Sequence, residues 1–545
     1  MKKKFILSAF AVLVTLSAWP CTNLIVGRKA SADGSVMITY SADDYGSYGF
    51  LHFYPAADHA PGTMRKLYDY ETNNYLGEIP EVSHTYNVIG QINEHQLSIM
   101  ETTFGGREEL TDTTGLFDYG SLMYVTLQRA RTAREAIDVW TNLVETYGYR
   151  SEGESITIAD PNDVWVLEII GKGPGRKGAV WVARRLPEDC ITGHANQARI
   201  TRFPLKDPKN CVYAKDVITF AREKGWLNGK DADFSFRDAY APNDFAARRI
   251  CEARVWTFFN RFCAGMDKYL PYAMGIEENT EEMPWCIKPD TLVSLNALKQ
   301  AMRDHYEGTP MQMTADIGAG PYEAPYRPTP LYFEVDSVKY FNERPISTQQ
   351  TAVTYLAQLR SWLPNHIGGL LWVGCDDANM VAYTPLYCCT TICPEPYAQE
   401  TADPFTFSLR SAYWVQNALS NFVYPRYCQL FPELRAARDR LDTELETETQ
   451  KIDQQAQRME HDASVRHLTD FTVKSTERMM EQWQQLFQRI IVKYNDMAIK
   501  PEKDGQFLKT PGGDHVPLIR TGYPDRFRRA ILRETGNHYL APTNK

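Results

Sequence analysis

The chain has 545 residues, of which 43% are hydrophobic, 12% aromatic and 23% charged. This is an ordinary globular composition, and the length allows one large elaborated domain or about two to three smaller ones. The formal net charge is -9 and no basic stripe is present, which argues against a nucleic-acid partner. After the N-terminal segment no apolar run is long enough to cross a bilayer, so we expect no membrane span. The composition leaves the oligomeric state open.

The N-terminal segment has the composition of a secretory signal peptide. Residues 1–4 (MKKK) are positively charged, and residues 5–19 are apolar and carry no charge. We therefore expect an exported bacterial protein, periplasmic or extracellular, whose mature chain begins at or near Cys21. Cleavage after Ala18 fits the preference for a small residue, and Trp19-Pro20 would then be trimmed.

Residues 21 to about 200 predict strands with one helical interlude. Strands are expected at 22–26, 36–40, 88–92, 97–101, 155–160, 165–170 and 179–184, with turn-rich connectors between them. Apolar residues at helical spacing predict a helix over 122–147. Strands, then a helical layer, then more strands indicate an α+β fold in which helices pack outside a sheet sandwich.

The remaining chain predicts further helices and one buried strand. Residues 245–259 and 351–362 are expected to be helical, and 368–374 a buried strand. A narrow apolar stripe from Leu434 to Met459 and a second helix over 465–494 predict a helical hairpin packed on the main body. The expected organisation is a signal peptide at 1–20, a main domain at 21–430, the hairpin at 431–500 and a C-terminal tail at 501–545.

The chain contains 11 cysteines. Without Cys21 their number is even, which is compatible with five disulfides and one free thiol in an oxidising compartment. Buried unpaired cysteines are also common, so the pairing stays open. The run Cys388-Cys389-Thr-Thr-Ile-Cys393 has no second Cys/His pair at metal-site spacing nearby, which argues against structural zinc.

The position of Cys21 leaves three interpretations open: a lipid anchor, a catalytic nucleophile, or an ordinary buried cysteine that opens a strand. A bacterial lipoprotein cysteine normally follows a small residue, and Trp19-Pro20 violates that pattern. A nucleophilic thiol with an unperturbed pKa of about 8.5 needs a base, and its own α-amine titrates at about 7.7–8.0. Because both groups share one Cα, the amine can take the thiol proton without a histidine partner.

Several segments resemble one known family. They are Cys21-Thr-Asn-Leu-Ile-Val-Gly27, Lys29-Ala-Ser-Ala-Asp-Gly-Ser35, Ser41-Ala-Asp43 and residues 156–168, 181–184, 194–200 and 362–372. They are similar to the dipeptidase A-type cysteine peptidases, N-terminal-nucleophile hydrolases related more distantly to bile salt hydrolases and penicillin V acylases. The resemblance covers essentially the whole mature chain. It implies a four-layer αββα sandwich with a C-terminal helical hairpin, and chemistry that needs no metal or organic cofactor.

The resemblance also implies catalytic residues. Cys21 matches the nucleophile and its α-amine the general base, while Asp43 matches a carboxylate that holds the amine in place, with Asp44 as the competing candidate. Asn196 matches an asparagine whose side-chain amide binds the developing oxyanion, a donor worth about 2.7–4 kcal/mol of transition-state stabilisation. Judged from the residues alone, Asp43 could also cap a turn and Asn196 could be a turn asparagine.

Further positions complete the implied site. Arg254 is expected to belong to it, with Arg248 as the alternative, although either could lie on the solvent face of a helix. Thr103 matches the position of a second polar oxyanion contact. His194 is expected to support the turn that carries the asparagine rather than to form a Cys–His dyad.

These expectations together describe an exported cysteine dipeptidase. It would hydrolyse short peptides through an N-terminal Cys21 nucleophile and a thioester acyl-enzyme. Two alternatives remain open at this point. One is an amidase or acylase acting on a non-peptide amide, such as a bile-acid or N-acyl conjugate. The other is a non-catalytic surface lipoprotein.

Overall fold

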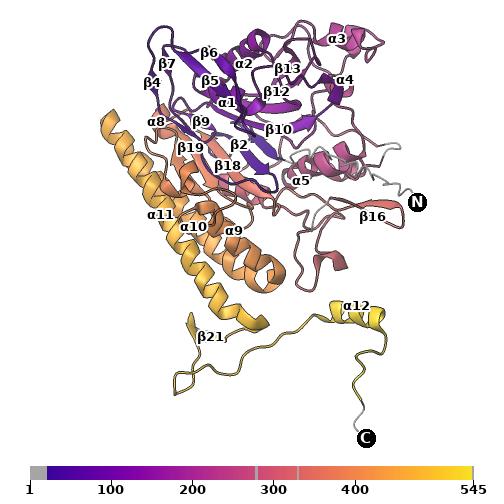
Figure 1. Ribbon diagram of the computed structural model, residues 1–545, viewed down its shortest axis with the longest axis vertical. Helices are drawn as coiled ribbons and strands as arrows, with labels where there is room; N and C mark the ends of the chain where they lie inside the picture. Colours follow the sequence, from indigo (N-terminus) through magenta and orange to yellow (C-terminus); the bar gives the residue numbers. More distant parts are fainter. Residues whose placement is uncertain (1–20, 277–279, 328–330, 543–545) are drawn as a thin grey trace, which may run out of the picture.

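The computed structural model describes residues 21–276, 280–327 and 331–542. The signal peptide and processing site expected within residues 1–20 lie outside the described residues. Two antiparallel sheets form the centre of the molecule, and helices lie on their outer sides (Figure 1).

The smaller sheet has six strands. Their order is β14 (Ile191–His194), β1 (Asn23–Val26), β2 (Val36–Asp43), β18 (Thr351–Leu359), β19 (Gly369–Gly374) and β20 (Thr384–Tyr387). The larger sheet has eight strands. Their order is β15 (Cys211–Tyr213), β13 (Ala179–Arg185), β12 (Val164–Gly171), β11 (Gly153–Ala159), β10 (Ser98–Gly105), β9 (Ile92–Asn93), β8 (Val88–Ile89) and β3 (Phe53–Tyr54).

The two sheets share a core. Strand β10 of the larger sheet packs against β1 and β2 of the smaller one, and apolar side chains from both sheets belong to one buried cluster. Strands β11, β12, β18 and β19 are buried along their whole length. Strands covered on both faces show no regular alternation of exposed and buried residues, because neither face meets water.

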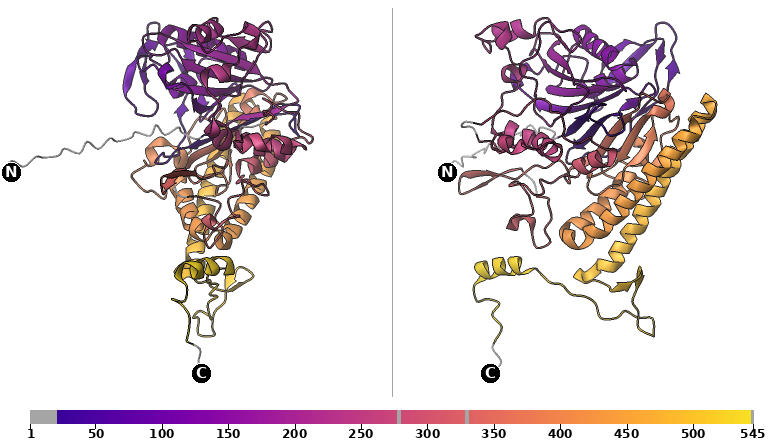
Figure 2. Two further views of the ribbon diagram at one scale, coloured as in Figure 1. Left: turned by 90° about the vertical axis from the view of Figure 1, so that its right-hand side faces the viewer. Right: turned by 180° about the vertical axis from the view of Figure 1, so that it is seen from behind.

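Helices cover the outer faces. On the larger sheet lie α1 (Tyr119–Leu127) and α2 (Ala133–Tyr147), where Trp140 joins a second buried cluster with side chains of β11, β12 and β13. The smaller sheet is covered by α9 (Ala412–Val423), α10 (Tyr427–Ala456) and α11 (His461–Tyr494), of which α10 and α11 contact β20. Figure 2 shows α10 and α11 side by side along one flank. The expected α and β class and C-terminal helical region are thus confirmed.

The remaining elements are short or peripheral. The helices are α3 (Val217–Glu223), α4 (Phe236–Tyr240), α5 (Ala253–Phe262), α6 (Leu270–Ala273), α7 (Leu295–Met302), α8 (Asn365–Gly368) and α12 (Asp525–Thr535). Two-stranded hairpins pair β4 (Ala57–Asp58) with β7 (His84–Thr85), β5 (Met64–Tyr68) with β6 (Tyr75–Pro80), β16 (Tyr332–Val335) with β17 (Val338–Phe341), and β21 (Glu502–Lys503) with β22 (Gln506–Phe507).

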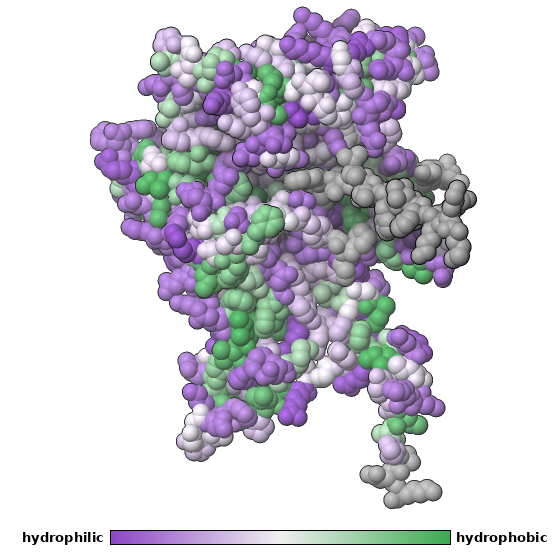
Figure 3. All heavy atoms as spheres, in the orientation of Figure 1, coloured by the Kyte–Doolittle hydropathy of each residue, from purple (hydrophilic) through white to green (hydrophobic). Residues whose placement is uncertain are grey.

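The C-terminal segment lies at the periphery. Helix α12 has no buried residue, and Figures 1 and 2 draw it away from the sheets. On the face shown in Figure 3, hydrophilic residues cover most of the upper part of the molecule, and hydrophobic residues gather lower down over the helical region. Within the described ranges, no helix combines the length and apolar character needed to span a bilayer.

Residues 351–362 do not form the expected helix. Their first nine residues are strand β18, which pairs with β2 on one side and β19 on the other. All of β18 is buried, so it lacks the alternating pattern that marks a half-exposed strand. Thr351, Val353 and Tyr355 favour the extended backbone, but a fully buried apolar run is ambiguous from its spacing alone.

The expected helix over 122–147 is broken into α1 and α2. Thr132 caps α2 by accepting a hydrogen bond from the backbone N–H of Glu135 at 3.2 Å. The buried Asn93 side chain donates to two carbonyls at the end of α1, at 2.7 and 2.8 Å. The Thr-x-x-Glu spacing is a capping-box sequence, so this break was visible in the sequence.

The strand expected over 88–92 is divided into β8 and β9, which pair with each other, and the strand expected over 97–101 is the first part of β10. The remaining expected elements are confirmed. The strands predicted at 22–26, 36–40, 155–160, 165–170, 179–184 and 368–374 correspond to β1, β2, β11, β12, β13 and β19. The helix expected over 245–259 corresponds to helical residues 247–262, and the two C-terminal helices to α10 and α11. All eleven cysteines lie in the described part of the chain and are free thiols, so their even number without Cys21 does not mark disulfides here.

Candidate active site

Cys21 lies at the head of β1 and lines an internal cavity. Its side chain is 3% exposed, and the cavity has a volume of about 420 Å³. Sγ of Cys21 is 3.8 Å from the Tyr40 hydroxyl and 4.0 Å from Oε1 of Glu101. Eight of the lining residues carry aromatic rings: Tyr40, Tyr48, Phe50, His52, Tyr70, Tyr119, Tyr124 and Tyr355. A peptide side chain would therefore meet apolar surface on most sides.

Arg254 ties Cys21 to Asn196. Its guanidinium, fully buried, donates through Nη1 to the Cys21 carbonyl at 2.6 Å and to the Thr22 hydroxyl at 2.9 Å. Nη2 donates to the Ala195 carbonyl at 3.0 Å and to Oδ1 of Asn196 at 2.9 Å. The planar fork of an arginine fixes several acceptors at once, so Arg254 acts as a brace beside the thiol.

The competing Arg248 lies elsewhere. It is half-buried, its guanidinium stacks 5.2 Å from the centre of the Tyr272 ring, and Nη1 reaches the Ile276 carbonyl at 3.4 Å. Of the two arginines weighed from the sequence, the structure brings only Arg254 to Cys21.

Asn196 is held in one orientation at the end of β14. Its backbone has a φ of 63°, in the left-handed region that asparagine tolerates better than most residues. Because Oδ1 accepts from Arg254, the amide nitrogen is directed toward β10, where it donates to the Thr103 carbonyl at 2.8 Å. The side chain is thus a preoriented amide next to the strand that lines the cavity.

Asp43 is buried and firmly partnered at the end of β2. Its carboxylate accepts from Arg344 at 2.5 Å, from the Thr351 hydroxyl at 2.6 Å and from the Ser41 hydroxyl at 3.0 Å. The backbone N–H of Asp43 hydrogen-bonds to the Cys21 thiol. Asp44 is only half-buried and accepts from Ser47. The structure thus places Asp43, rather than Asp44, directly against the nucleophile.

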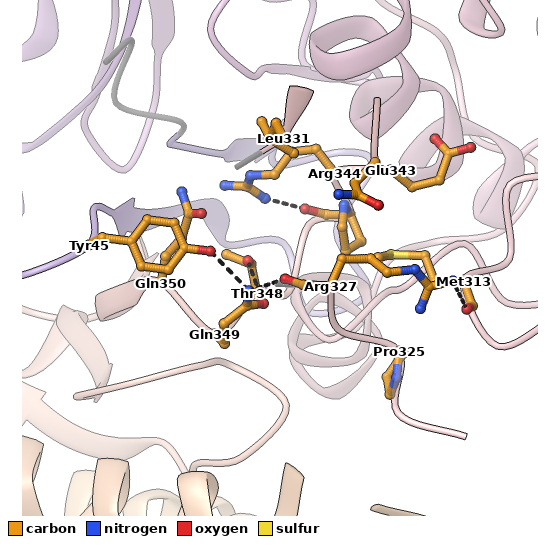
Figure 4. Close-up of a pocket in the computed structure, with 12 residues that line it drawn as sticks. Tyr45, Met313, Pro325, Arg327, Leu331, Glu343, Arg344, Thr348, Gln349 and Gln350 are labelled. Carbon is orange, nitrogen blue, oxygen red and sulfur yellow. Dashed lines mark hydrogen bonds between the residues drawn. The ribbon is translucent and has the colours of Figure 1, made fainter. Parts of the chain in front are cut away.

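Arg344 was not expected from the sequence. It forms a buried ion pair with Asp43 although the two residues are 301 positions apart. Arg344 also lines a small pocket with Tyr45, Arg327 and Gln349, shown in Figure 4. That pocket holds only about 20 Å³, room for about one water molecule, so it is too small for a peptide.

The thiol is strongly biased toward its neutral form. Burial raises the pKa of Cys21 well above its usual value, and the carboxylates of Glu101 and Asp43 raise it further. The Asp43 N–H and the Tyr40 hydroxyl oppose this by hydrogen-bonding to sulfur. A thiol in this setting needs a closely placed base to become a nucleophile.

His194 does not supply that base. It is 1% exposed, and burial lowers the pKa of its imidazole to about 3. Nδ1 lies 2.7 Å from the Thr102 hydroxyl and Nε2 2.7 Å from the Thr157 hydroxyl. A neutral ring with both nitrogens engaged fits the expected supporting role.

Thr103 is near the thiol but its hydroxyl faces another group. It lines the cavity and donates to Oε1 of Glu154 at 2.7 Å, across the β10–β11 pair. Its hydroxyl is thus committed to a carboxyl group, which weakens the sequence-based expectation of an oxyanion contact from this side chain.

Glu101 is the residue that sequence reasoning missed. It is 2% exposed, and burial raises the pKa of its carboxyl to about 7. The Tyr40 hydroxyl donates a hydrogen bond to Oε1 at 2.6 Å, which opposes that rise in the pKa. The expected strand ended at Glu101, whereas β10 continues to Gly105. A charged residue inside a buried strand is rare without a partner, so the longer strand would have marked it.

Cys21 lines the cavity, and Arg254 joins its carbonyl to the side chain of Asn196 beside it. Comparison with known proteins identifies the class. The family model described as Peptidase family C69 matches residues 20–440, and the chain belongs to that family. The expected resemblance is therefore confirmed, and with it a cysteine-type peptidase.

Individual relatives agree with this assignment. The chain is 26% identical to a probable dipeptidase of Salmonella dublin, over 71% of this chain and 84% of the relative. It is 25% identical to a probable dipeptidase of Latilactobacillus sakei, over 76% of this chain and 82% of the relative. Dipeptidase A of Lactobacillus helveticus is 24% identical, over 85% of this chain and 93% of the relative.

Proposed function

We propose that this protein is an exported dipeptidase, periplasmic or extracellular, that acts through Cys21 as an N-terminal nucleophile. Removal of residues 1–20 would free the α-amine of Cys21. The observation that carries the proposal is the thiol itself, buried in a cavity of peptide size with its pKa raised and the nearby His194 neutral and engaged. The dipeptidase names of the relatives support the substrate class.

The fold supports the same proposal. Helices α1 and α2, the larger sheet, the smaller sheet and helices α9 to α11 succeed one another in that order. We propose that this is the four-layer αββα sandwich of N-terminal-nucleophile hydrolases. In such an arrangement the nucleophile opens a central strand and faces the space between the sheets, as Cys21 does at β1.

The proposed reaction proceeds in two stages. The Cys21 α-amine takes the thiol proton, sulfur attacks the scissile carbonyl carbon, and the carbonyl oxygen becomes an oxyanion that the Asn196 amide stabilises. The resulting ammonium gives its proton to the leaving amine as the C–N bond breaks, which leaves a thioester on Cys21. Water, deprotonated by the same amine, attacks the thioester, and the released thiolate recovers a proton as the carboxylic acid departs.

Two residues position this machinery. Arg254 holds the Cys21 carbonyl and the Asn196 side chain, so the thiol and the oxyanion donor keep a fixed relation. Asp43, anchored by Arg344, places a negative charge and a backbone N–H beside the nucleophile. The charge would favour the ammonium form of the α-amine at the stage where it carries the proton.

The alternatives fit the site less well. A lipid anchor requires a Cys21 sulfur that reaches the membrane surface, whereas this side chain is 3% exposed and lines a cavity. A bile-acid or other anionic conjugate would enter a cavity whose lining includes the carboxyl groups of Asp44, Glu71, Glu101 and Asp403. Those charges repel an anionic substrate and favour a peptide with a free amine.

The test uses purified protein that begins at Cys21. It should hydrolyse dipeptides, and mass spectrometry after rapid acid quench should detect the N-terminal residue of the substrate attached to Cys21. Cys21→Ala and Cys21→Ser should be folded and inactive, and protein that retains Trp19-Pro20 should be inactive because no free α-amine is present. Turnover by Cys21→Ala would refute the nucleophile, and full turnover with Trp19-Pro20 attached would refute the base.

A further inference from the structure

The Cys21 cavity carries negative charge without a matching cationic side chain among the described residues. Of the described residues that line it, four have carboxyl groups, namely Asp44, Glu71, Glu101 and Asp403, and none is Lys or Arg. Its one histidine, His52, has a pKa lowered to about 4 by burial and is therefore neutral at physiological pH. A cavity lined in this way favours a positively charged ligand group.

Glu101 is the innermost of these carboxyl groups. Its side chain is 2% exposed and forms no ion pair with any Lys, Arg or His within the described ranges. Oε1 accepts from Tyr40, and the protonated carboxyl of Glu154 donates a second hydrogen bond to Glu101, but neither group carries a positive charge. Such a buried carboxylate is costly unless something else pairs with it.

Glu101 becomes ionised as the pH passes about 7, and the surrounding side chains do not balance that charge. Burial and the Glu101 charge raise the pKa of Glu154 well above its usual value, so Glu154 holds a proton that it shares with Glu101. Burial raises the pKa of Glu101 to about 7, and the hydrogen bonds from Tyr40 and Glu154 lower it. The other charged groups that face Glu101 are the carboxylates of Glu71 and Asp43. None of these neighbouring side chains carries a positive charge that would balance the carboxylate.

We infer that Glu101 binds the α-ammonium group of the substrate's N-terminal residue and thereby selects the first peptide bond for cleavage. This inference rests on the proposed function, because it assumes that a peptide carbonyl is attacked by Cys21. It adds the chemical group that the enzyme recognises and the residue that recognises it.

The distances support this assignment. In the first residue of a peptide, the α-nitrogen lies two bonds beyond the carbonyl carbon, with bond lengths of about 1.52 and 1.46 Å. Oε1 of Glu101 is 4.0 Å from the sulfur that attacks this carbon. An ammonium on the first residue can therefore reach hydrogen-bond distance of Glu101 when the carbonyl carbon reaches the sulfur.

A substrate with one more residue before the cleaved bond would not match this distance between Glu101 and the sulfur. Successive Cα atoms are about 3.8 Å apart, so attack on the second peptide bond would carry the ammonium past Glu101. N-acylated peptides would lack the charge altogether and leave the carboxylate buried without a cation. The aromatic walls add to the selection, because Tyr40, Tyr70 and Tyr119 present ring surfaces that attract an ammonium group.

The experiment compares four matched substrates on the wild-type enzyme: a dipeptide, its N-methyl form, its N-acetyl form and its desamino form. The first two keep a positive charge and should be cleaved with kcat/KM values within about 10-fold of each other. The last two should be slower by about 100-fold, the order expected for an unpaired buried charge. Cleavage of the N-acetyl form as fast as the dipeptide would overturn the inference while leaving the dipeptidase proposal intact.

A pair of variants assigns the effect to Glu101. Glu101→Gln keeps the shape of the side chain and should lower kcat/KM for the dipeptide about 100-fold, with the slow N-acetyl rate unchanged or increased. Glu78→Gln, an exposed carboxylate on β6 outside the cavity, should match wild type on every substrate. Equal losses on the dipeptide and on the N-acetyl form would overturn the inference, since Glu101 would then serve the Cys21 amine instead.

Failure of the proposed function gives a different result. In that case wild-type enzyme would cleave none of the four substrates, or Cys21→Ala would keep its activity, and Glu101 would not be at issue. Glu101→Asp guards against loss of folding in the glutamine variant, because it keeps the charge and should still prefer the dipeptide over the N-acetyl form by at least 10-fold. Loss of that preference in a folded Glu101→Asp variant would count against the inference.

Discussion

Replacing Glu101 by glutamine should stabilise the protein above neutral pH. Burial raises the pKa of this carboxyl from its ordinary value of 4.5 to about 7, so the folded state holds a proton that the unfolded chain releases. As pH rises from about 4.5 to about 7, the unfolded state gains stability relative to the folded state, and the cost is fully present above that window. Glutamine has no proton to lose and keeps the hydrogen-bond acceptor for Tyr40.

The size of the effect follows from the same change. A rise from 4.5 to about 7 corresponds to about 3 kcal/mol, at about 1.4 kcal/mol for each pKa unit. For a chain of 545 residues this converts to a rise in Tm of roughly 3 °C. Differential scanning calorimetry between pH 4 and pH 8.5 should show wild type and Glu101→Gln unfolding together at pH 4 and separating between pH 5 and 8.

Glu78→Gln supplies the control because Glu78 is exposed on β6. Its Tm should follow wild type at every pH. A Glu101→Gln variant whose Tm stays parallel to wild type over the whole range would show that Glu101 titrates in the folded protein as it does in water. A variant that is less stable at pH 8 would show that the carboxylate already has a cationic partner, which would refute the reasoning about its burial.

Three further outcomes follow from the site. Arg344→Met leaves Asp43 buried without its cation and should lower the free energy of unfolding by about 3–5 kcal/mol, a loss that adding Asp43→Asn should partly restore in denaturant titrations. Asn196→Ala should reduce kcat by about 100- to 1000-fold with little change in KM, and a change in KM alone would contradict the oxyanion role. The kcat/KM profile for a dipeptide should fall above about 8, where the substrate amine loses its proton, and Glu101→Gln should remove the rise near pH 7 that Glu101 contributes while the rise from deprotonation of the Cys21 α-amine remains.

The spacing of apolar residues and the positions of turn residues predicted the elements whose structure depends on neighbouring residues in the sequence. Strands β1 and β2 lie between turn-rich connectors, and the two long C-terminal helices carry a stripe of apolar residues, so both were predicted correctly. The prediction of a helix at the residues of β18 was wrong because this strand is buried on both faces and therefore shows no alternation of apolar and polar residues. What makes it a strand is its pairing with β19, the next strand along the chain, and with β2, which comes from the N-terminal part of the chain.

The residues of the site also divide into those that the sequence predicted and those that only the fold reveals. Cys21 could be singled out by its position after a signal-like segment, and the family resemblance pointed to Asn196 and Arg254, which the structure links through one guanidinium. Glu101 and Arg344 carry no motif. Each matters only because the fold brings it to Cys21 or Asp43, and such a contact between distant segments leaves no trace in a single sequence.

The stability cost at Glu101 and its proposed role have one origin. A carboxylate that was stabilised by a lysine or arginine of this chain would not need a ligand, and it would offer a substrate amine no net charge. The burial that destabilises the empty enzyme above pH 7 is what gives a bound ammonium its advantage, since the incoming charge relieves the penalty that the fold imposes. The same substitution should therefore raise Tm and lower kcat/KM for dipeptides. A Glu101→Gln enzyme that gained stability and kept full dipeptidase activity would separate the two effects and assign the buried charge no part in recognition.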